Sequence, residues 1–468
     1  MKAGLWFTIC NFIQRGIQFL IVPLYTRLLT SEGYGNYSVF LAWMNIITIF
    51  ATLNMSGGIY YNGVMKYVGK CPQYTSSVLT LGSLSTLLVF LLASLFYPAI
   101  SSYIGLPYFI FLLMFVAIFF YQALMIWTAN QRINYKYKAL IVITILVSLL
   151  SPLFGLLFVV KFNMGYEGLV YGLVLCYLFV CGWLFITILY KGKCFFQRDY
   201  WKYSLKLSLP LLPHYLSMIL LGQMSRIIVQ YYCGASLAGI YSLAYQVSLI
   251  MNLFISGINS ALTPWLYHNL KEQKYSEIKR VTTILILSIG LISVFAMLIA
   301  PEITLILGGY NYMEAIWIIP PVLLSTLLTF VYSIYGTILF FYEKTKWVAI
   351  STSSGAILNI LLNILLIPKY GYIAAGYVSL ISYFLLYIMY RFFSSKVCSQ
   401  KSIDFGTIFN LRLILQILLV VAVASCLALG LYTVGFICRV LAIAALFCVL
   451  YRYKDNYLIT LIKIKSLL

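Results

Sequence analysis

The chain has 468 residues, of which 63% are hydrophobic and only 9% are charged, compared with about 25% charged residues in ordinary soluble proteins. A soluble fold could not bury this much apolar surface, so the composition predicts an all-α polytopic membrane protein. The formal net charge of +21 raises the question of nucleic-acid binding. The basic residues are scattered in short segments between apolar stretches, however, and no basic domain exists that could bind nucleic acid.

Apolar windows of about 20 residues, the length that crosses a bilayer, predict fourteen membrane spans. These lie at 5–29, 37–61, 78–97, 108–128, 139–160, 169–190, 207–230, 239–266, 281–300, 316–342, 348–367, 374–392, 411–431 and 434–451. The first apolar segment is too long for a cleavable signal peptide, and no hydrophilic stretch is long enough for a separate soluble domain.

The basic residues also predict the orientation of these spans. With both ends of the chain inside, 25 of the 31 basic residues fall in inner segments, and only Lys161 and Lys369 fall in outer loops. The remaining four lie within predicted spans. This asymmetry follows the positive-inside rule, so membrane topology accounts for the basic charge.

The chain contains an internal repeat. GNYS (35–38) recurs as GIYS (239–242), 204 positions later, and GYEGLVYG (165–172) recurs loosely as GYIAAGYV (371–378), 206 positions later. Both pairs fall in corresponding places, which predicts two six-span halves in the same orientation, as in transporters with parallel repeats.

The predicted organisation is therefore a first six-helix lobe, a basic inner loop, a second six-helix lobe, another inner loop, two additional helices and a basic tail. The boundaries of these six segments are 1–190, 191–206, 207–392, 393–410, 411–451 and 452–468, in that order.

The first span carries a polar stripe. At 100° per residue, Asn11, Gln14, Arg15 and Gln18 fall within about a third of the helix circumference. Arg15 lies near mid-span, where an arginine costs roughly 2.5–3.5 kcal/mol on insertion scales. None of the ten acidic residues lies mid-membrane to neutralise it. Arg15 is satisfied either by backbone carbonyls and amides in a dry core or by an anion in a watery cavity, and the one-sided stripe favours the cavity.

The first span of the second half repeats this arrangement. Gln223, Arg226 and Gln230 share one helix face at i, i+3, i+7 spacing. The alternative for Arg226 is a side chain that snorkels to the lipid headgroups. For Arg27 and Arg439, which lie closer to span ends, snorkelling is the favoured interpretation.

Asn359 and Asn363, one turn apart, form the best pair for a further polar seam. Amides within spans often only bridge helices, although together they would also suit a cavity that receives hydroxyl-rich cargo. With two histidines and no C-x-x-C pair among ten cysteines, we expect no metal site. The motif G-x-x-x-x-G-K-[ST] is absent and the outer loops are short and nearly uncharged, so we expect no enzyme and no cofactor.

Two longer stretches resemble a known family. VPLYTRLLTSEGYGNYSVF (22–40) is similar to the first hairpin of the bacterial polysaccharide-export flippases, and IPKYGYIAAGYVSLISY (367–383) is similar to their twelfth-span signature. These flippases are the Wzx-like members of the multidrug/oligosaccharidyl-lipid/polysaccharide exporter (MOP) superfamily. The resemblance covers nearly the whole chain in span count and half-to-half spacing.

The resemblance implies an alternating-access flippase for polyprenyl-pyrophosphate-linked oligosaccharide, the repeat unit of O-antigen or capsule, in the bacterial inner membrane. It also implies two lobes around a central cationic cavity, and it leaves a partnership with polysaccharide polymerase machinery open. Cavity arginines without acidic partners suit an anionic headgroup. The runner-up, a cation-coupled exporter of organic solutes, would need an intramembrane carboxylate, and the spans contain none.

Overall fold

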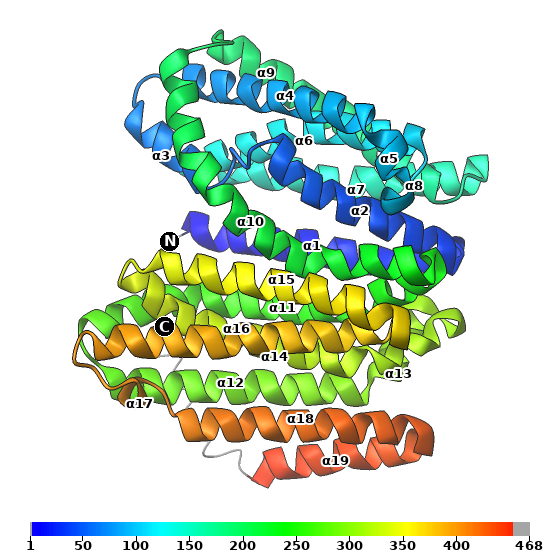
Figure 1. Ribbon diagram of the computed structural model, residues 1–468, viewed down its shortest axis with the longest axis vertical. Coiled ribbons are helices and arrows are strands. Elements are labelled where there is room, and N and C mark those ends of the chain that lie inside the picture. Colours follow the sequence, from blue (N-terminus) through cyan, green and yellow to red (C-terminus); the bar gives the residue numbers. More distant parts are fainter. Residues whose placement is uncertain (1, 453–468) are drawn as a thin grey trace. The chain divides into compact units, whose positions relative to one another are not determined.

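The computed structural model describes the backbone of residues 2–452 and the side chains of those residues except 2–9, 11, 58 and 445–452. Every regular element in this described part is a helix (Figure 1). The first ten elements are α1 (Lys2–Leu28), α2 (Ser31–Ala51), α3 (Gly58–Lys66), α4 (Cys71–Leu95), α5 (Tyr97–Ile104), α6 (Tyr108–Ile133), α7 (Tyr137–Phe162), α8 (Tyr166–Cys176), the π-helical segment η1 (Tyr177–Cys181) and α9 (Gly182–Gly192).

The remaining elements follow after a short loop. They are α10 (Arg198–Cys233), α11 (Ala235–Lys271), α12 (Tyr275–Leu298), α13 (Ala300–Gly308), the 3-10 helix η2 (Tyr310–Trp317), α14 (Ile319–Phe341), α15 (Thr345–Tyr370), α16 (Ala374–Ser399), α17 (Phe405–Ile408), α18 (Leu411–Val434) and α19 (Phe436–Arg452).

Eleven helices in the described residues are long and apolar enough to cross a membrane, counting α8, η1 and α9 as one. They coincide with eleven of the fourteen predicted spans. The other three predicted spans, 5–29, 37–61 and 434–451, correspond to α1, to α2 with α3, and to α19. The all-helical membrane fold is therefore confirmed, while the count of fourteen and the inner location of both ends stay predictions.

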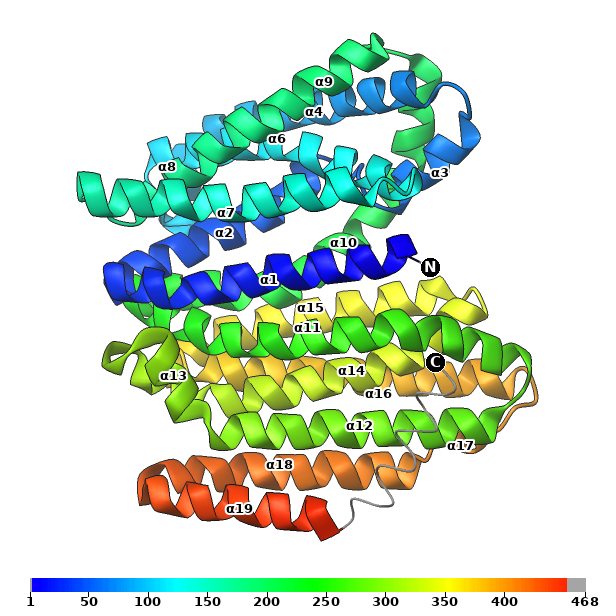
Figure 2. The same ribbon diagram turned by 180° about the vertical axis from the view of Figure 1, so that it is seen from behind.

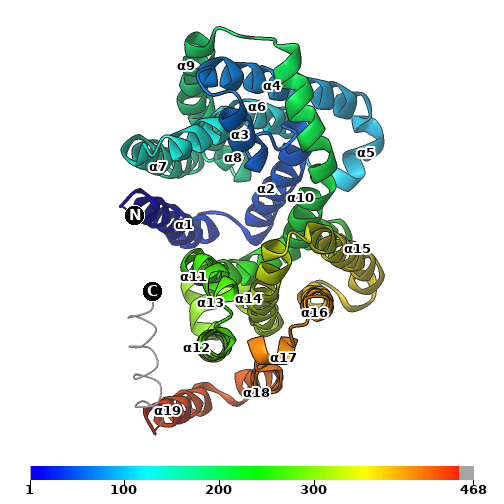
Figure 3. The same cartoon turned by 90° about the vertical axis from the view of Figure 1, so that its left-hand side faces the viewer.

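The chain divides into two compact units, Met1–Ser242 and Leu243–Leu468. In the first unit α1 packs on α7, α7 packs on α8, and α4 packs on α6 and α9 (Figure 2). Helix α10 belongs to this unit and packs on α2, α3 and α4, although the sequence predicted that it would open the second lobe. In the second unit α14 and α15 pack on α16, and α12 packs on α14 and α18 (Figure 3).

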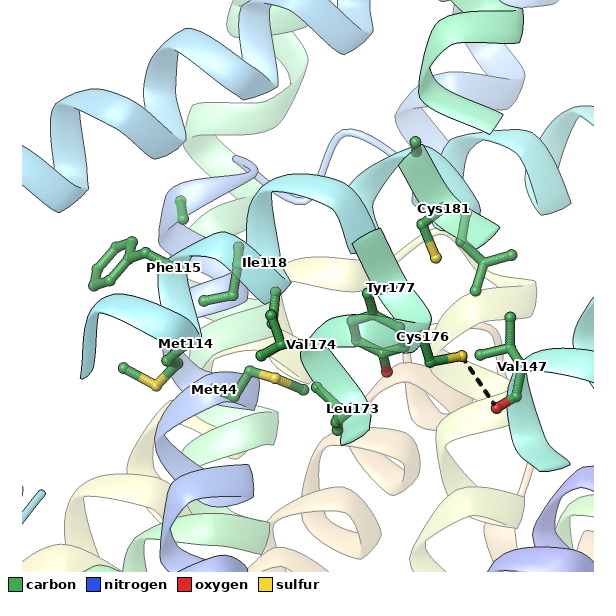
Figure 4. Close-up of a cluster of buried hydrophobic side chains, with 14 of the residues drawn as sticks. Met44, Met114, Phe115, Ile118, Val147, Leu173, Val174, Cys176, Tyr177 and Cys181 are labelled. Atoms are coloured by element: carbon green, nitrogen blue, oxygen red, sulfur yellow. Dashed lines mark hydrogen bonds between the residues drawn. The ribbon is translucent and has the colours of Figure 1, made fainter. Parts of the chain in front are cut away.

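The core of the first unit is apolar and sulfur-rich. Figure 4 shows Met44 of α2 and Met114 of α6 beside residues of α8 and η1. The thiol of Cys176 donates to the backbone carbonyl of Val147 at 3.8 Å, which links α8 to α7. Cys176 and Cys181 are buried, as expected for cysteines that act as small packing residues.

The two copies of the repeated tetrapeptide cross each other within the first unit. A Cβ on Gly35 would overlap the backbone carbonyl of Ala235, and a Cβ on Gly239 would overlap that of Ser31. The contacts are reciprocal, because each glycine meets the residue four positions before the other glycine. The hydroxyl groups of Ser31 and Ser236 lie 2.7 Å apart at the same crossing. This pairing is what a two-fold relation between equivalent helix starts produces.

A further repeat feature escaped the sequence comparison. Helix α4 continues after one residue into the short helix α5, and α12 continues in the same way into α13. Each short helix has a proline in its first turn, Pro98 and Pro301, where the missing N–H leaves no hydrogen bond unmade. The two halves therefore share helix order as well as motif spacing.

The second predicted span, 37–61, is not one continuous helix. Helix α2 ends at Ala51, residues 52–57 form a turn, and α3 begins at Gly58. Leu53 and Asn54 adopt φ angles of 52° and 46°, which side-chain-bearing residues rarely adopt. The signal for the break is the run of turn-forming residues NMSGG at 54–58. The equivalent helix of the second repeat, α11, is continuous, so this break distinguishes the two halves.

The glycine crossing predicts a large difference between two substitutions in α11. Gly239→Ala should lower the free energy of unfolding by about 1–3 kcal/mol, because the added methyl group must push two backbones apart. Gly257→Ala, with open space around its position, should be neutral or stabilising by up to about 1 kcal/mol. Thermal unfolding of the purified variants in detergent measures both effects, and equal stabilities would contradict the close crossing.

Candidate functional site

The polar stripe of α1 divides between two environments. Arg15 and Gln18 are exposed, whereas Gln14 is half-buried and lines a cavity within the first unit. The side chain of Asn11 lies outside the described residues. The exposed Arg15 is therefore not enclosed by the described residues, and its place in a cavity stays a prediction. No carboxylate lies within ion-pair distance of Arg15 in the part of the chain whose side chains are described, since the three ion pairs found there use other residues.

The cavity that Gln14 reaches has a volume of about 340 Å³. Helix α6 provides the largest share of its wall, from Tyr121 through Thr128 to Arg132 at the end of the helix. Thr144 of α7 completes this side. Arg132 is exposed, so its guanidinium lies at the mouth of the cavity.

Another part of the wall is formed by the break between α2 and α3. Ser56 and Gly57 of the turn and Tyr61 of α3 line the cavity. Helix α3 begins here with Gly57 as its N-cap, and no side chain caps its first turn. Backbone N–H groups at a helix start carry partial positive charge. Arg132 is the only charged residue among those that line this cavity, so its charge makes the pocket cationic.

The predicted residues on α10 are engaged within the first unit. Arg226 is only 7% exposed, and its Nη1 donates to Oε1 of Gln223 at 3.3 Å. This burial argues against a snorkelling side chain, which needs its charged end in water. Gln230 is half-buried and donates from Nε2 to Oδ1 of Asn36 at 3.0 Å, which ties α10 to α2.

Asn359 and Asn363 are fully buried in the second unit. Asn363 Nδ2 donates to Oδ1 of Asn359 at 2.9 Å, and Asn359 Nδ2 donates to the hydroxyl of Ser382 at 3.2 Å. The amides form the predicted polar seam and connect α15 to α16. This placement favours the helix-bridging role that the sequence left open.

The predicted snorkelling of Arg439 is wrong. Its Nη1 and Nη2 each lie 2.9 Å from one carboxylate oxygen of Glu302, which gives a two-pronged ion pair between α19 and α13. Arg439 is 9% exposed, so the charge is neutralised inside the second unit. The sequence placed both residues near span ends but gave no sign that they meet. Arg27, by contrast, is exposed at the end of α1, as expected.

A larger hollow of about 470 Å³ lies along the C-terminal half of α16, beside Arg391 and Lys396. All of its lining residues come from this one helix, so it is a surface depression and not an enclosed site. Its basic residues fit the predicted inner side of the membrane. No group of three or more potential metal-ligating side chains occurs in the described residues.

Comparison with known proteins shows which family the chain belongs to. The family described as "Polysaccharide biosynthesis protein" matches residues 1–270, more than half of the chain. The chain belongs to this family. Lsg locus putative protein 1 of Haemophilus influenzae is 25% identical, over 71% of this chain and 82% of that protein. The probable low-salt glycan biosynthesis flippase Agl15 of Haloferax volcanii is 22% identical, over 86% of this chain and 84% of its own length.

Solved structures agree on the fold. The lipid II flippase MurJ in an inward closed conformation superposes with a TM-score of 0.73 at 15% identity, over 97% of this chain and 99% of MurJ. An inward-facing MATE-family multidrug transporter of the MOP superfamily gives 0.64 at 15% identity, over 84% of this chain and 95% of that one. The chain is therefore a multi-pass membrane protein of the polysaccharide biosynthesis family, and it shares its fold with MurJ and with this MATE-family transporter.

The ion pair in the second unit yields a stability prediction. Glu302→Gln should destabilise the protein by about 1.5–3 kcal/mol, because charge-assisted hydrogen bonds to a largely buried guanidinium are lost. The double variant Glu302→Gln/Arg439→Gln should lose less than the sum of the two single variants, since both act on one interaction. Thermal unfolding of all four proteins measures the coupling, and strict additivity would contradict the pairing.

Proposed function

We propose that this protein is an alternating-access flippase for polyprenyl-pyrophosphate-linked oligosaccharide. It moves repeat units from the cytoplasmic to the outer leaflet of the bacterial inner membrane, where they supply O-antigen or capsule synthesis. Support comes from its family, from the MOP fold and from relatives whose names include a glycan biosynthesis flippase.

The observation that carries the proposal is Arg15, an exposed guanidinium midway along α1 with no carboxylate near it in the described structure. Lipid is an unfavourable environment for such a group, so it requires water or an anion. A guanidinium binds phosphate oxygens in a planar, two-pronged arrangement. Arg15 and Arg226 are the proposed pyrophosphate ligands, and Gln14, Gln18 and Gln223 donate to its oxygens or to sugar hydroxyls.

The charge of the cargo suggests an energy source. Moving about two negative charges outward across an inside-negative potential of about 100 mV releases roughly 4–5 kcal/mol if no cation accompanies them. Net transport then needs neither a proton relay nor nucleotide hydrolysis. A cation-coupled exporter of organic solutes shares the fold, but the described part of the first unit offers its cavity an arginine and no acid.

A rescue experiment tests this function. In a host that lacks its own flippase but holds a matched polysaccharide pathway, the wild-type chain should restore lipid-linked repeat units at the outer face. Arg15→Ala should abolish rescue by removing the phosphate ligand, whereas Arg27→Ala, an exposed arginine of the same helix, should retain it. Surface labelling of the polymer gives the readout, and immunoblotting of membranes verifies insertion of each variant.

The outcomes of this experiment separate the alternatives. Rescue by Arg15→Ala would return Arg15 to a structural role while keeping the flippase. Failure of the inserted wild type with matched cargo would favour the small-solute exporter. Arg15→Lys should rescue poorly, because an ammonium group binds phosphate as a point charge and lacks the planar two-pronged geometry.

A second prediction concerns the driving force. In vesicles loaded with lipid-linked oligosaccharide, collapsing the membrane potential while keeping the pH gradient should slow net flipping. Collapsing the pH gradient at constant potential should leave the rate unchanged. The transbilayer distribution of the oligosaccharide, followed by its accessibility to an external lectin, measures both rates. A rate that depends only on the pH gradient would refute potential-driven transport.

A further inference from the structure

The cavity beside α6 contains more than the polar stripe of α1 predicted. Of its lining residues only Gln14 was expected to contact cargo. The others come from the α2–α3 turn, from α3, from α6 and from α7. Together they bring aromatic rings, hydroxyl groups and one guanidinium to the cavity, beside the apolar side chains of Leu124, Met125 and Ala129.

The size and walls of the cavity fit a sugar. Its volume of about 340 Å³ is at the lower end of the range for small-molecule sites, about 300–1,000 Å³. This suits a single sugar unit with its substituent. Tyr61 and Tyr121 provide rigid amphipathic rings with hydroxyl groups, and Ser56 and Thr144 add hydroxyl groups that match those of a sugar.

The charge of the cavity fits an anion. Arg132 lies at its mouth, and none of the residues that line it is acidic. Gly57, the N-cap of α3, also lines this space, so the partial positive charge of the helix start lies beside it. An arginine fork and a helix start both bind the oxygen atoms of phosphate or carboxylate groups.

The broken helix is an independent observation in favour of a binding site. Irregular backbone at membrane depth is tolerated only where it is buried in protein or lines a water-filled cavity. Residues 52–57 include two side-chain-bearing residues with positive φ, a strained conformation that is typical of functional segments. The second repeat has no such break in α11. The first repeat therefore carries a feature that the fold itself does not require.

A purely structural explanation exists for Arg132. Cations are favourable at helix C-termini and on the inner side of a membrane. Lys138, exposed at the start of α7, satisfies the same topological rule without lining the cavity. The rule explains why a cation lies near this loop but not why one lies at the mouth of an aromatic, hydroxyl-lined pocket.

We infer that this cavity is a subsite for an anionic saccharide unit, with Arg132 on its carboxylate or phosphate group and Tyr61 and Tyr121 against the sugar. The inference rests on the proposed function and deepens it, because it assigns part of the cargo headgroup to a defined pocket. It places the subsite near the predicted inner ends of α6 and α7, where cargo from the cytoplasmic leaflet would first be met.

Direct binding to the purified full-length protein in detergent tests the subsite. The probes are glucose 1-phosphate, glucuronic acid, glucose and inorganic phosphate, and titration calorimetry measures their dissociation constants. We expect at least one acidic sugar to bind about tenfold or more tightly than glucose and inorganic phosphate. Glucose 1-phosphate and glucuronic acid distinguish a phosphate next to the sugar from a sugar carboxylate as the bound anion.

The matched variants are Arg132→Gln and Lys138→Gln, which each remove one cation from the same inner region. Arg132→Gln should abolish the preference for the acidic sugar, and Lys138→Gln should change its affinity by less than about twofold. Tyr61→Leu should weaken the acidic sugar and glucose together, which provides a second route if Arg132→Gln does not fold. Thermal unfolding verifies that each variant is intact.

Three results would overturn the subsite. These are a wild type without preference for acidic sugars, an Arg132→Gln variant that binds them as the wild type does, and inorganic phosphate that binds as tightly as glucose 1-phosphate. The rescue experiment separates this failure from failure of the proposed function. A wild type that rescues polysaccharide export but binds no acidic sugar here would remain a flippase whose cargo is held elsewhere.

Discussion

A chain in lipid must satisfy its backbone hydrogen bonds internally, and the architecture of this protein follows from that constraint. All regular structure in residues 2–452 is helical, and the helices pack within each unit through apolar faces and close backbone approaches. The turn at 52–57 differs from the other connections because it interrupts a predicted membrane span. Because irregular backbone is unfavourable in lipid, the turn lies where protein and a polar cavity surround it. The need to satisfy backbone hydrogen bonds, which produces helices elsewhere, therefore draws attention to the pocket beside this turn.

The arginines within the predicted spans accommodate their charge in different ways. Arg439 is neutralised by Glu302, so its charge is used to hold two helices together. Arg15 is exposed without a carboxylate near it in the described residues, and Arg27 lies at a helix end. A neutralised arginine contributes structure, whereas an arginine without an acid leaves its charge available for an anion from outside the protein. The net charge of +21 therefore says little about function by itself. The environment of each basic side chain has to be known first.

Hydropathy located the eleven membrane helices with each end within nine residues of the observed one, because span length and apolarity are local properties. The repeated tetrapeptides were also visible, and the structure brings them into contact. The family resemblance drawn from residues 22–40 and 367–383 is confirmed. The pairing of Arg439 with Glu302 was not visible, since it joins residues 137 positions apart. The turn at 52–57 was missed because the window 37–61 has the length of one membrane span. The few polar residues at its end could equally belong to a span or to a loop. The role of the turn as a pocket wall depends on α6, which only the tertiary fold brings beside it.

The reciprocal crossing of Gly35 and Gly239 has a consequence for how the protein is made. The two glycines are 204 positions apart, so at about 5–20 residues per second the first waits roughly 10–40 s for its partner to be synthesised. During this interval the start of α2 has no counterpart and presents exposed backbone to the translocon or to lipid. Correct insertion of the second repeat therefore completes the packing of the first. Variants that delay or misorient the later helices should expose the nascent first half to membrane quality-control proteases.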